Sequence, residues 1–166
     1  GAERGATAVR HLVDPTAMLS SWARWHSHRR AETLLAHALF QDPLAFVRER
    51  IAPVLPVGLW AITGWLALEQ RAPFVTSIPR VTIYLDPEVV SGSEVLPDLL
   101  KRAELREVDR GARVAVVTSD RYATRTAPRG HVLPLVSDIR LYGDLLREGV
   151  RGPDAAEHLR ETVIGF

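Results

Sequence analysis

An uncharged stretch over residues 51–68 limits the folds open to this chain more than any other segment. A continuous apolar helix of this length could cross a bilayer. Pro53, Pro56, Gly58 and Gly64 divide the stretch into pieces that are each too short to do so. We therefore expect the end of a helix, a turn, a buried strand and the start of another helix here, and no membrane contacts. Because the chain contains no cysteine, we expect a cytoplasmic protein.

Segments with strand and helix patterns alternate along the chain. The clearest strand covers residues 80–85, where β-branched and aromatic side chains stop at an Asp-Pro pair, and residues 59–62 predict another strand. Asp-Pro pairs at 14–15 and 42–43 predict two helix starts, because Asp caps a helix well and Pro suits its first turn. The alternation predicts an α/β (α+β) domain that has a mixed sheet with flanking helices.

Three further segments are candidates for strands. Residues 9–13 predict a short strand, and residues 33–40 fit either a strand or a helix. Residues 105–108 and 113–118 flank the turn-forming sequence at 109–112, which predicts that they pair as a hairpin.

The end of the chain predicts a C-terminal helical pair, one helix beginning at Ser137 or Asp138 and the other at Pro153. We expect residues 13–166 to form a single α/β domain and residues 1–12 to be an extension or the remnant of a preceding domain. Because the sequence begins without Met and without an apolar leader, we expect no secretory signal and a chain trimmed from a longer protein.

Composition excludes several kinds of chemistry. The chain contains no cysteine, which rules out disulfides, thiolate metal sites and a cysteine nucleophile. His26 and His28 are the closest histidines, but a spacing of two on a helix points them to different faces, so we expect no metal site. The apolar residues of that helix share one face and are expected in the core: Met18, Leu19, Trp22 and Trp25.

The distribution of charge is more informative than its sum. A net charge of +1 argues against a nucleic-acid surface that covers the whole domain. Two stretches nevertheless lack acids, one between residues 15 and 31 and one between Asp120 and Asp138. Their arginines could contact phosphates or an acidic partner, although solvation is the commonest role of an exposed arginine. These candidate contacts are Arg24, Arg29, Arg30, Arg121, Arg125 and Arg129.

Several segments resemble a known family. Residues 135–146 and 151–160 resemble the C-terminus of the AbiEi-type antitoxins and transcriptional regulators of type IV toxin–antitoxin systems. Segments that match the same family occur in the expected order at 19–25, 61–64 and 81–85. The resemblance implies the second domain of a two-domain bacterial regulator, whose DNA-binding winged helix this chain would lack. It also implies a toxin partner and a homodimer.

The middle of the chain has a more distant resemblance, to the nucleotidyltransferase fold. In that fold a strand leads into a phosphate-holding turn, and a later strand carries two metal-binding aspartates. Thr63, Gly64 and Asp86 would then mark a relic nucleotide pocket. Trp65 stands where a small hydroxyl residue is wanted and Tyr84 replaces one aspartate, so the metal chemistry would be lost. The simpler role for Asp86 is to end a strand and open a turn.

Three functions remain open on the sequence. The favoured hypothesis is a non-catalytic, cofactor-free regulatory domain that supports DNA binding, dimerisation or toxin neutralisation. The alternatives are a divergent nucleotidyltransferase that uses Asp86 and the turn at Thr63, and a plain oligomerisation module.

Overall fold

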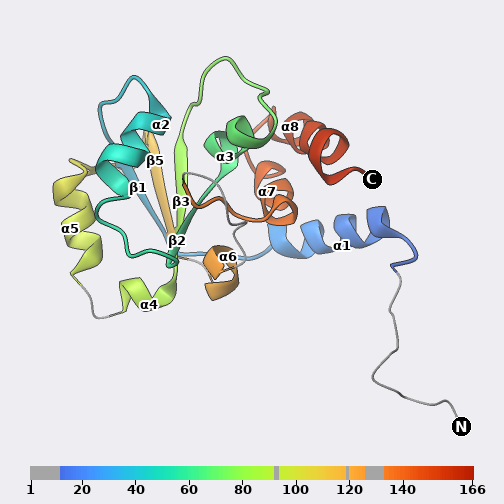
Figure 1. Ribbon diagram of the computed structural model, residues 1–166, viewed down its shortest axis with the longest axis horizontal. Helices are drawn as coiled ribbons and strands as arrows, with labels where there is room; N and C mark the ends of the chain where they lie inside the picture. The colour runs from blue at the N-terminus through green and yellow to red at the C-terminus, as the bar shows by residue number, and fades with distance from the viewer. Residues whose placement is uncertain (1–11, 92–93, 119, 126–132) are drawn as a thin grey trace, which may run out of the picture.

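Five strands in the described part of the chain form one mixed sheet in the order β2-β3-β5-β1-β4 (Figure 1). The computed structural model describes residues 12–91, 94–118, 120–125 and 133–166. The strands are β1 (Thr33–His37), β2 (Trp60–Thr63), β3 (Val81–Leu85), β4 (Arg106–Glu107) and β5 (Val114–Thr118). Among these five strands, β3 and β5 pair in parallel and the other neighbours are antiparallel. The predicted α/β class and mixed sheet are confirmed.

The predicted hairpin is wrong, because β1 lies between the two strands that were expected to pair. β5 pairs with β1 and β3, whereas β4 pairs only with β1, through Ala36–Glu107 and His37–Arg106. The side chains explain this order. Val114 is fully buried and suits a central strand, whereas Arg106 and Glu107 are exposed and suit a short edge strand.

Helices surround the sheet and begin where the sequence predicts. Asp14 accepts a hydrogen bond from the backbone of Ala17, Asp42 from that of Leu44 and Ser137 from that of Arg140, so all three predicted caps are present. The helices are α1 (Pro15–Ser27), α2 (Pro43–Phe46), α3 (Gly64–Arg71), α4 (Pro87–Val90), α5 (Val95–Arg102), α6 (Arg121–Arg125), α7 (Asp138–Leu145) and α8 (Gly152–Leu159). α2 continues as a π-helical turn (Val47–Ile51), and so does α8 (Arg160–Ile164).

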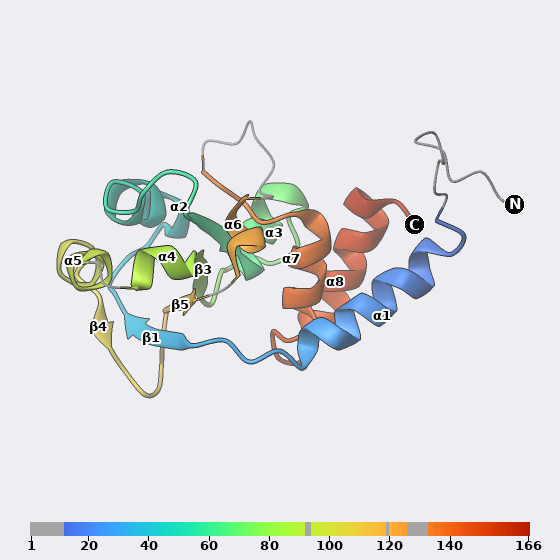
Figure 2. The same ribbon diagram turned by 90° about the horizontal axis from the view of Figure 1, so that it is seen from below.

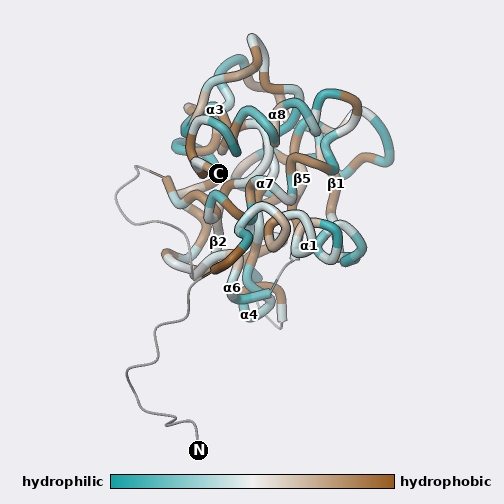
Figure 3. Tube along the Cα trace, turned by 90° about the vertical axis from the view of Figure 1, so that its right-hand side faces the viewer, coloured by the Kyte–Doolittle hydropathy of each residue, from teal (hydrophilic) through white to brown (hydrophobic). Residues whose placement is uncertain are grey.

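The helices lie in two groups. α1, α7 and α8 lie together on one side of the sheet and α2 and α5 on the other (Figures 1 and 2). α7 packs against both α1 and α8, which confirms the predicted C-terminal helical pair. Hydrophilic and hydrophobic residues are interspersed along the chain on the side where these three helices lie (Figure 3).

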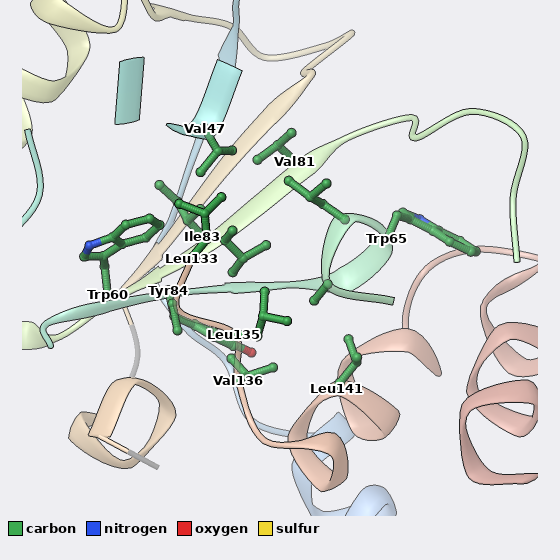
Figure 4. Close-up of a cluster of buried hydrophobic side chains, with 14 of the residues drawn as sticks. Val47, Trp60, Trp65, Val81, Ile83, Tyr84, Leu133, Leu135, Val136 and Leu141 are labelled. Carbon is green, nitrogen blue, oxygen red and sulfur yellow. The ribbon is translucent and has the colours of Figure 1, made fainter. Parts of the chain in front are cut away.

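The uncharged stretch at 51–68 folds as its prolines and glycines predict. It contains the end of a helical turn, a loop, the buried strand β2 and most of α3. A segment from far along the chain, which includes Leu135 and Val136, lies beside β2 (Figure 4). Ile62 donates a backbone hydrogen bond to Pro134 and accepts one from Val136. Within the residues that the structure describes, no helix is long and apolar enough to cross a membrane.

Strand β3 gives the sheet two different faces. Its side chains alternate, so Val81, Ile83 and Leu85 point to one side and Thr82 and Tyr84 to the other. The first set is fully buried in the apolar core. The opposite face therefore carries hydroxyl groups, and it is the face that lies under α1 and α7.

Two expectations near the start of α1 are corrected. Met18 and Trp25 are more than half exposed, while Leu19 is buried, so the apolar face is narrower than its pattern suggested. The reason is that α1 packs mainly on α7 through one stripe. The strand expected at 9–13 falls mostly outside the described residues, and Leu12 and Val13 are exposed and not in a strand.

Candidate functional site

A buried carboxylate, Asp144, joins four elements of the fold. Thr63 Oγ1 donates a hydrogen bond to Asp144 Oδ2 at 2.5 Å, and Tyr84 Oη donates one to Oδ1 at 2.8 Å. His26 Nε2 lies 2.6 Å from the same Oδ1. Asp144 comes from α7, His26 from α1, Thr63 from the end of β2 and Tyr84 from β3. All four side chains are buried, and they link the sheet to the helices above it.

Close packing of α1 on α7 puts His26 at this carboxylate. A Cβ atom at Gly143 would lie only 2.7 Å from the Trp22 ring and 2.8 Å from the His26 ring, so glycine is required there. The Trp22 and His26 rings stack with their centroids 4.8 Å apart, which fixes the imidazole orientation.

The chemistry of Tyr84 follows from its surroundings. Burial raises the pKa of Tyr84 well above its usual value, and the adjacent charge of Asp144 raises it further. Tyr84 therefore remains protonated and serves as a hydrogen-bond donor to the carboxylate. Because three side chains hydrogen-bond to it, the Asp144 carboxylate has a structural role in holding the helices on the sheet.

A cleft of about 410 Å³ opens beside this network. Its floor is the hydroxyl-bearing face of the sheet, together with Leu35, Ala115 and Val117 from neighbouring strands. Its walls are strongly basic, and they are lined by Arg29, Arg30, Arg80, Arg140 and Arg147. The cleft thus combines a partly apolar floor with a cationic wall.

Acidic side chains on the wall are held by some of these arginines. Arg29 and Arg140 both contact Asp120 Oδ2, at 2.8 and 3.1 Å. Partial burial would raise the pKa of Asp120, but Arg140 and Arg29 outweigh it and hold the pKa below its ordinary value. Arg80 contacts Glu148 at 3.1 Å, and Glu148 also accepts a hydrogen bond from the indole of Trp65.

The lowered pKa of Asp120 predicts a pH dependence of stability. The stabilising contacts with Arg29 and Arg140 should be fully present above the ordinary carboxyl pKa of 3.8 and be lost as the pH falls through the lower folded value. We expect Asp120→Asn to lower the unfolding free energy by at most about 1 kcal/mol at neutral pH, because the site is partly exposed. The difference between variant and wild type should shrink below about pH 4 in urea titrations. A difference that persisted unchanged into that acid range would contradict this assignment.

The structure does not bring the three residues of the expected nucleotide pocket together. Thr63 pairs with Thr82 at one end of the β2–β3 pair, whereas Asp86 follows Leu85, which pairs with Trp60 at the other end. Antiparallel pairing separates the two sites. Asp86 is buried and follows β3, and it caps α4 by accepting a hydrogen bond from the backbone of Glu88, so it opens a short helix and not the turn that its sequence position suggested.

Gly64 lies beside Thr63 at the turn from β2 into α3. Its φ of +64° is the backbone reason for glycine at this position. A Cβ there would lie 3.5 Å from Glu148, so the turn also approaches the wall of the cleft closely.

The predicted arginine contacts fall in different places. Arg24 and Arg121 are exposed at the end of α1 and the start of α6, and Arg29 and Arg30 line the cleft. The Arg29–Asp120 ion pair joins the two basic stretches, which are far apart in the sequence. Arg125 is the last residue of α6, and Arg129 lies outside the described residues.

Sequence reasoning missed the centre of the site. Asp144, Arg80, Arg140 and Arg147 were not singled out, and His26 was considered only for metal binding. One signal was available for Asp144. It lies among apolar residues of a helix whose buried side includes Leu141 and Leu145, and a carboxylate at such a position needs partners.

Comparisons with known proteins identify a family. No curated protein and no solved structure matches this chain. The family model described as "Transcriptional regulator, AbiEi antitoxin, Type IV TA system" matches residues 11–165, nearly the whole chain. The resemblance found in the sequence motifs is thereby confirmed. The chain belongs to the family of AbiEi antitoxins and transcriptional regulators of type IV toxin–antitoxin systems.

Proposed function

We propose that this chain is the non-catalytic C-terminal domain of a toxin–antitoxin transcriptional regulator, and that it adds phosphate contacts to DNA binding. The observation that carries the proposal is the Arg29–Asp120 ion pair at 2.8 Å. It joins the end of α1 to the start of α6, so the two acid-poor stretches meet. We call the resulting surface the arginine face, made up of Arg24, Arg29, Arg30 and Arg121.

The chemistry of the arginine face suits nucleic acid. Arg24, Arg30 and Arg121 are exposed and free to reach a phosphate backbone. Trp25 is 58% exposed beside them, and the guanidinium of Arg29 lies over its ring at 5.1 Å. Exposed aromatic rings among arginines favour contact with bases or sugars as well as phosphates.

Several features favour a role without catalysis. Asp86 is used as a helix cap, far from Thr63 in the strand pairing. The carboxylate of Asp144 is surrounded by three hydrogen-bonding partners and is buried. Among the residues that the structure describes, no group of three or more potential ligands could hold a metal ion.

The family supplies the wider context of the proposal. A toxin–antitoxin regulator has DNA and a toxin as its general partners. We propose that the whole protein carries a winged helix before this chain, which would supply sequence-specific binding. Toxin neutralisation and homodimer formation are further proposed roles of this domain.

Removing charge from the arginine face should weaken DNA binding. We expect R24Q/R30Q/R121Q to bind a fluorescent duplex from upstream of the protein's own gene roughly tenfold more weakly than the wild-type chain does, because phosphate contacts dominate such binding. Fluorescence anisotropy at fixed salt measures the effect.

The matched control removes the same number of charges elsewhere. Arg48 lies in the π-helical turn after α2, Arg102 ends α5, and Arg110 lies in the loop after β4. All three are exposed. R48Q/R102Q/R110Q should bind DNA like the wild type. Equal weakening in both triple variants would mean that only net charge matters, which would remove support for a dedicated arginine face.

A further inference from the structure

We propose that the cleft beside Asp144 binds a small phosphorylated compound with a flat, partly apolar body, such as a mononucleotide or a sugar phosphate. This inference goes beyond the proposed DNA contacts, because it concerns the interior of the cleft and a ligand small enough to enter it. Its volume of about 410 Å³ is in the range of small-ligand sites.

The charge balance of the walls favours an anion. Five arginines line the cleft against three acids, Asp120, Asp144 and Glu148. Each acid is already engaged, Asp120 and Glu148 by arginines and Asp144 by the buried network. Arg30 and Arg147 are exposed and have no ion pair within the described part of the chain. An incoming dianion would find two guanidinium groups without competing carboxylates.

Three of the eight buried side-chain polar atoms that lack a hydrogen-bond partner in the described part of the chain belong to residues of this cleft. They are Thr82 Oγ1, Arg80 Nε and His26 Nδ1, which have no hydrogen-bond partner among the residues that the structure describes. Thr82 is only 8% exposed. Since most buried polar groups in proteins are paired, these three atoms are available for hydrogen bonds with a polar ligand in the cleft.

The arginine side chains of the wall suit a phosphate group. Guanidinium groups present planar pairs of N–H donors that match phosphate oxygens, and each such charged hydrogen bond is stronger than a neutral one. The floor of the cleft, in contrast to its charged wall, is partly apolar. Leu35, Ala115 and Val117 form an apolar patch beside the hydroxyl of Thr82, which suits a base or the carbon face of a sugar.

Isothermal calorimetry with four probes tests the proposal on the 166-residue chain. Adenosine 5′-monophosphate and ribose 5-phosphate carry the phosphate, and adenosine and ribose lack it. We expect saturable binding only of the phosphorylated probes. Binding of both would identify a sugar phosphate as the recognised unit, whereas binding of adenosine 5′-monophosphate alone would identify a nucleotide. No saturable binding of either, or equal binding of the unphosphorylated probes, would overturn the proposal.

Variants inside the cleft separate this ligand from DNA. R147Q should lower the affinity for the phosphorylated probe roughly tenfold. T82V should lower it less, because a charged hydrogen bond contributes more than a neutral one. Arg147 is exposed and Thr82→Val nearly conserves shape, so both variants should fold, which thermal unfolding checks. Arg24 and Arg121 lie outside the cleft, so R24Q/R121Q should weaken DNA binding and leave the affinity for the small ligand unchanged. Unchanged small-ligand affinity in both R147Q and T82V would contradict the assignment, whatever the DNA result.

Discussion

Replacing Asp144 with alanine should lower the unfolding free energy by about 3–5 kcal/mol, the range seen when one partner of a buried charged network is removed. The carboxylate accepts hydrogen bonds from Thr63 and Tyr84 and contacts His26, and all of these groups are buried. Its loss leaves their polar atoms unpaired and leaves a gap where α7 meets α1 and the sheet. Urea denaturation measures the change.

An exposed carboxylate provides the matched control. Asp98 lies on α5, and its side chain is about half exposed, with only a 3.4 Å contact to Arg102. Asp98→Ala should change the unfolding free energy by less than about 0.5 kcal/mol. If Asp144→Ala were no more destabilising than Asp98→Ala, the buried network would not link α1 and α7 to the sheet as described.

The second large effect is expected at Gly152→Ala. A Cβ atom there would lie 2.2 Å from the carbonyl oxygen of Leu145, a backbone atom that cannot rotate away. The last turn of α7 and the start of α8 would have to separate. We expect a loss of about 3 kcal/mol of unfolding free energy, at the upper end of ordinary overpacking.

Gly111→Ala separates this clash from simple backbone strain. Gly111 has a φ of +69° but no atom within 4 Å of an added Cβ. Its alanine variant should lose only about 1 kcal/mol, the cost of a left-handed conformation. Equal losses at Gly111 and Gly152 in thermal and urea unfolding would show that α7 and α8 are not packed as closely as described.

Local chemistry made much of the fold predictable. The caps at Asp14, Asp42 and Ser137 act on residues only two or three positions away, so the sequence contains all that is needed to place them. The alternation in residues 81–85 likewise predicts a strand without reference to the rest of the chain.

Long-range pairing was not predictable in the same way. The position of β1 between β4 and β5 depends on how well β5 fits a central place, which no local turn signal reveals. The Asp144 network joins residues 60 to 118 positions apart. A single sequence contains no signal for such partners beyond the oddity of a carboxylate on a buried helix face.

The two basic stretches combine a feature that the sequence predicts with one that it does not. Their lack of acids was visible in the sequence, but the contact that joins them, Arg29 to Asp120, required the fold. The residues of the expected nucleotide pocket do not come together, and this too required the fold. Thr63 ends β2 and Asp86 follows β3, and only the antiparallel pairing of these strands reveals that the two residues lie at opposite ends of the pair.

A salt titration of DNA binding by the chain tests the proposed phosphate contacts most directly. We expect weak binding whose association constant falls steeply with salt, by about 0.9 logarithmic units per logarithmic unit of salt for each phosphate contacted. R24Q/R30Q/R121Q should reduce that slope by roughly 2 to 3, and R48Q/R102Q/R110Q should leave it unchanged. Tight binding that is insensitive to salt, or the same slope in the wild type and R24Q/R30Q/R121Q, would contradict a phosphate-contacting arginine face.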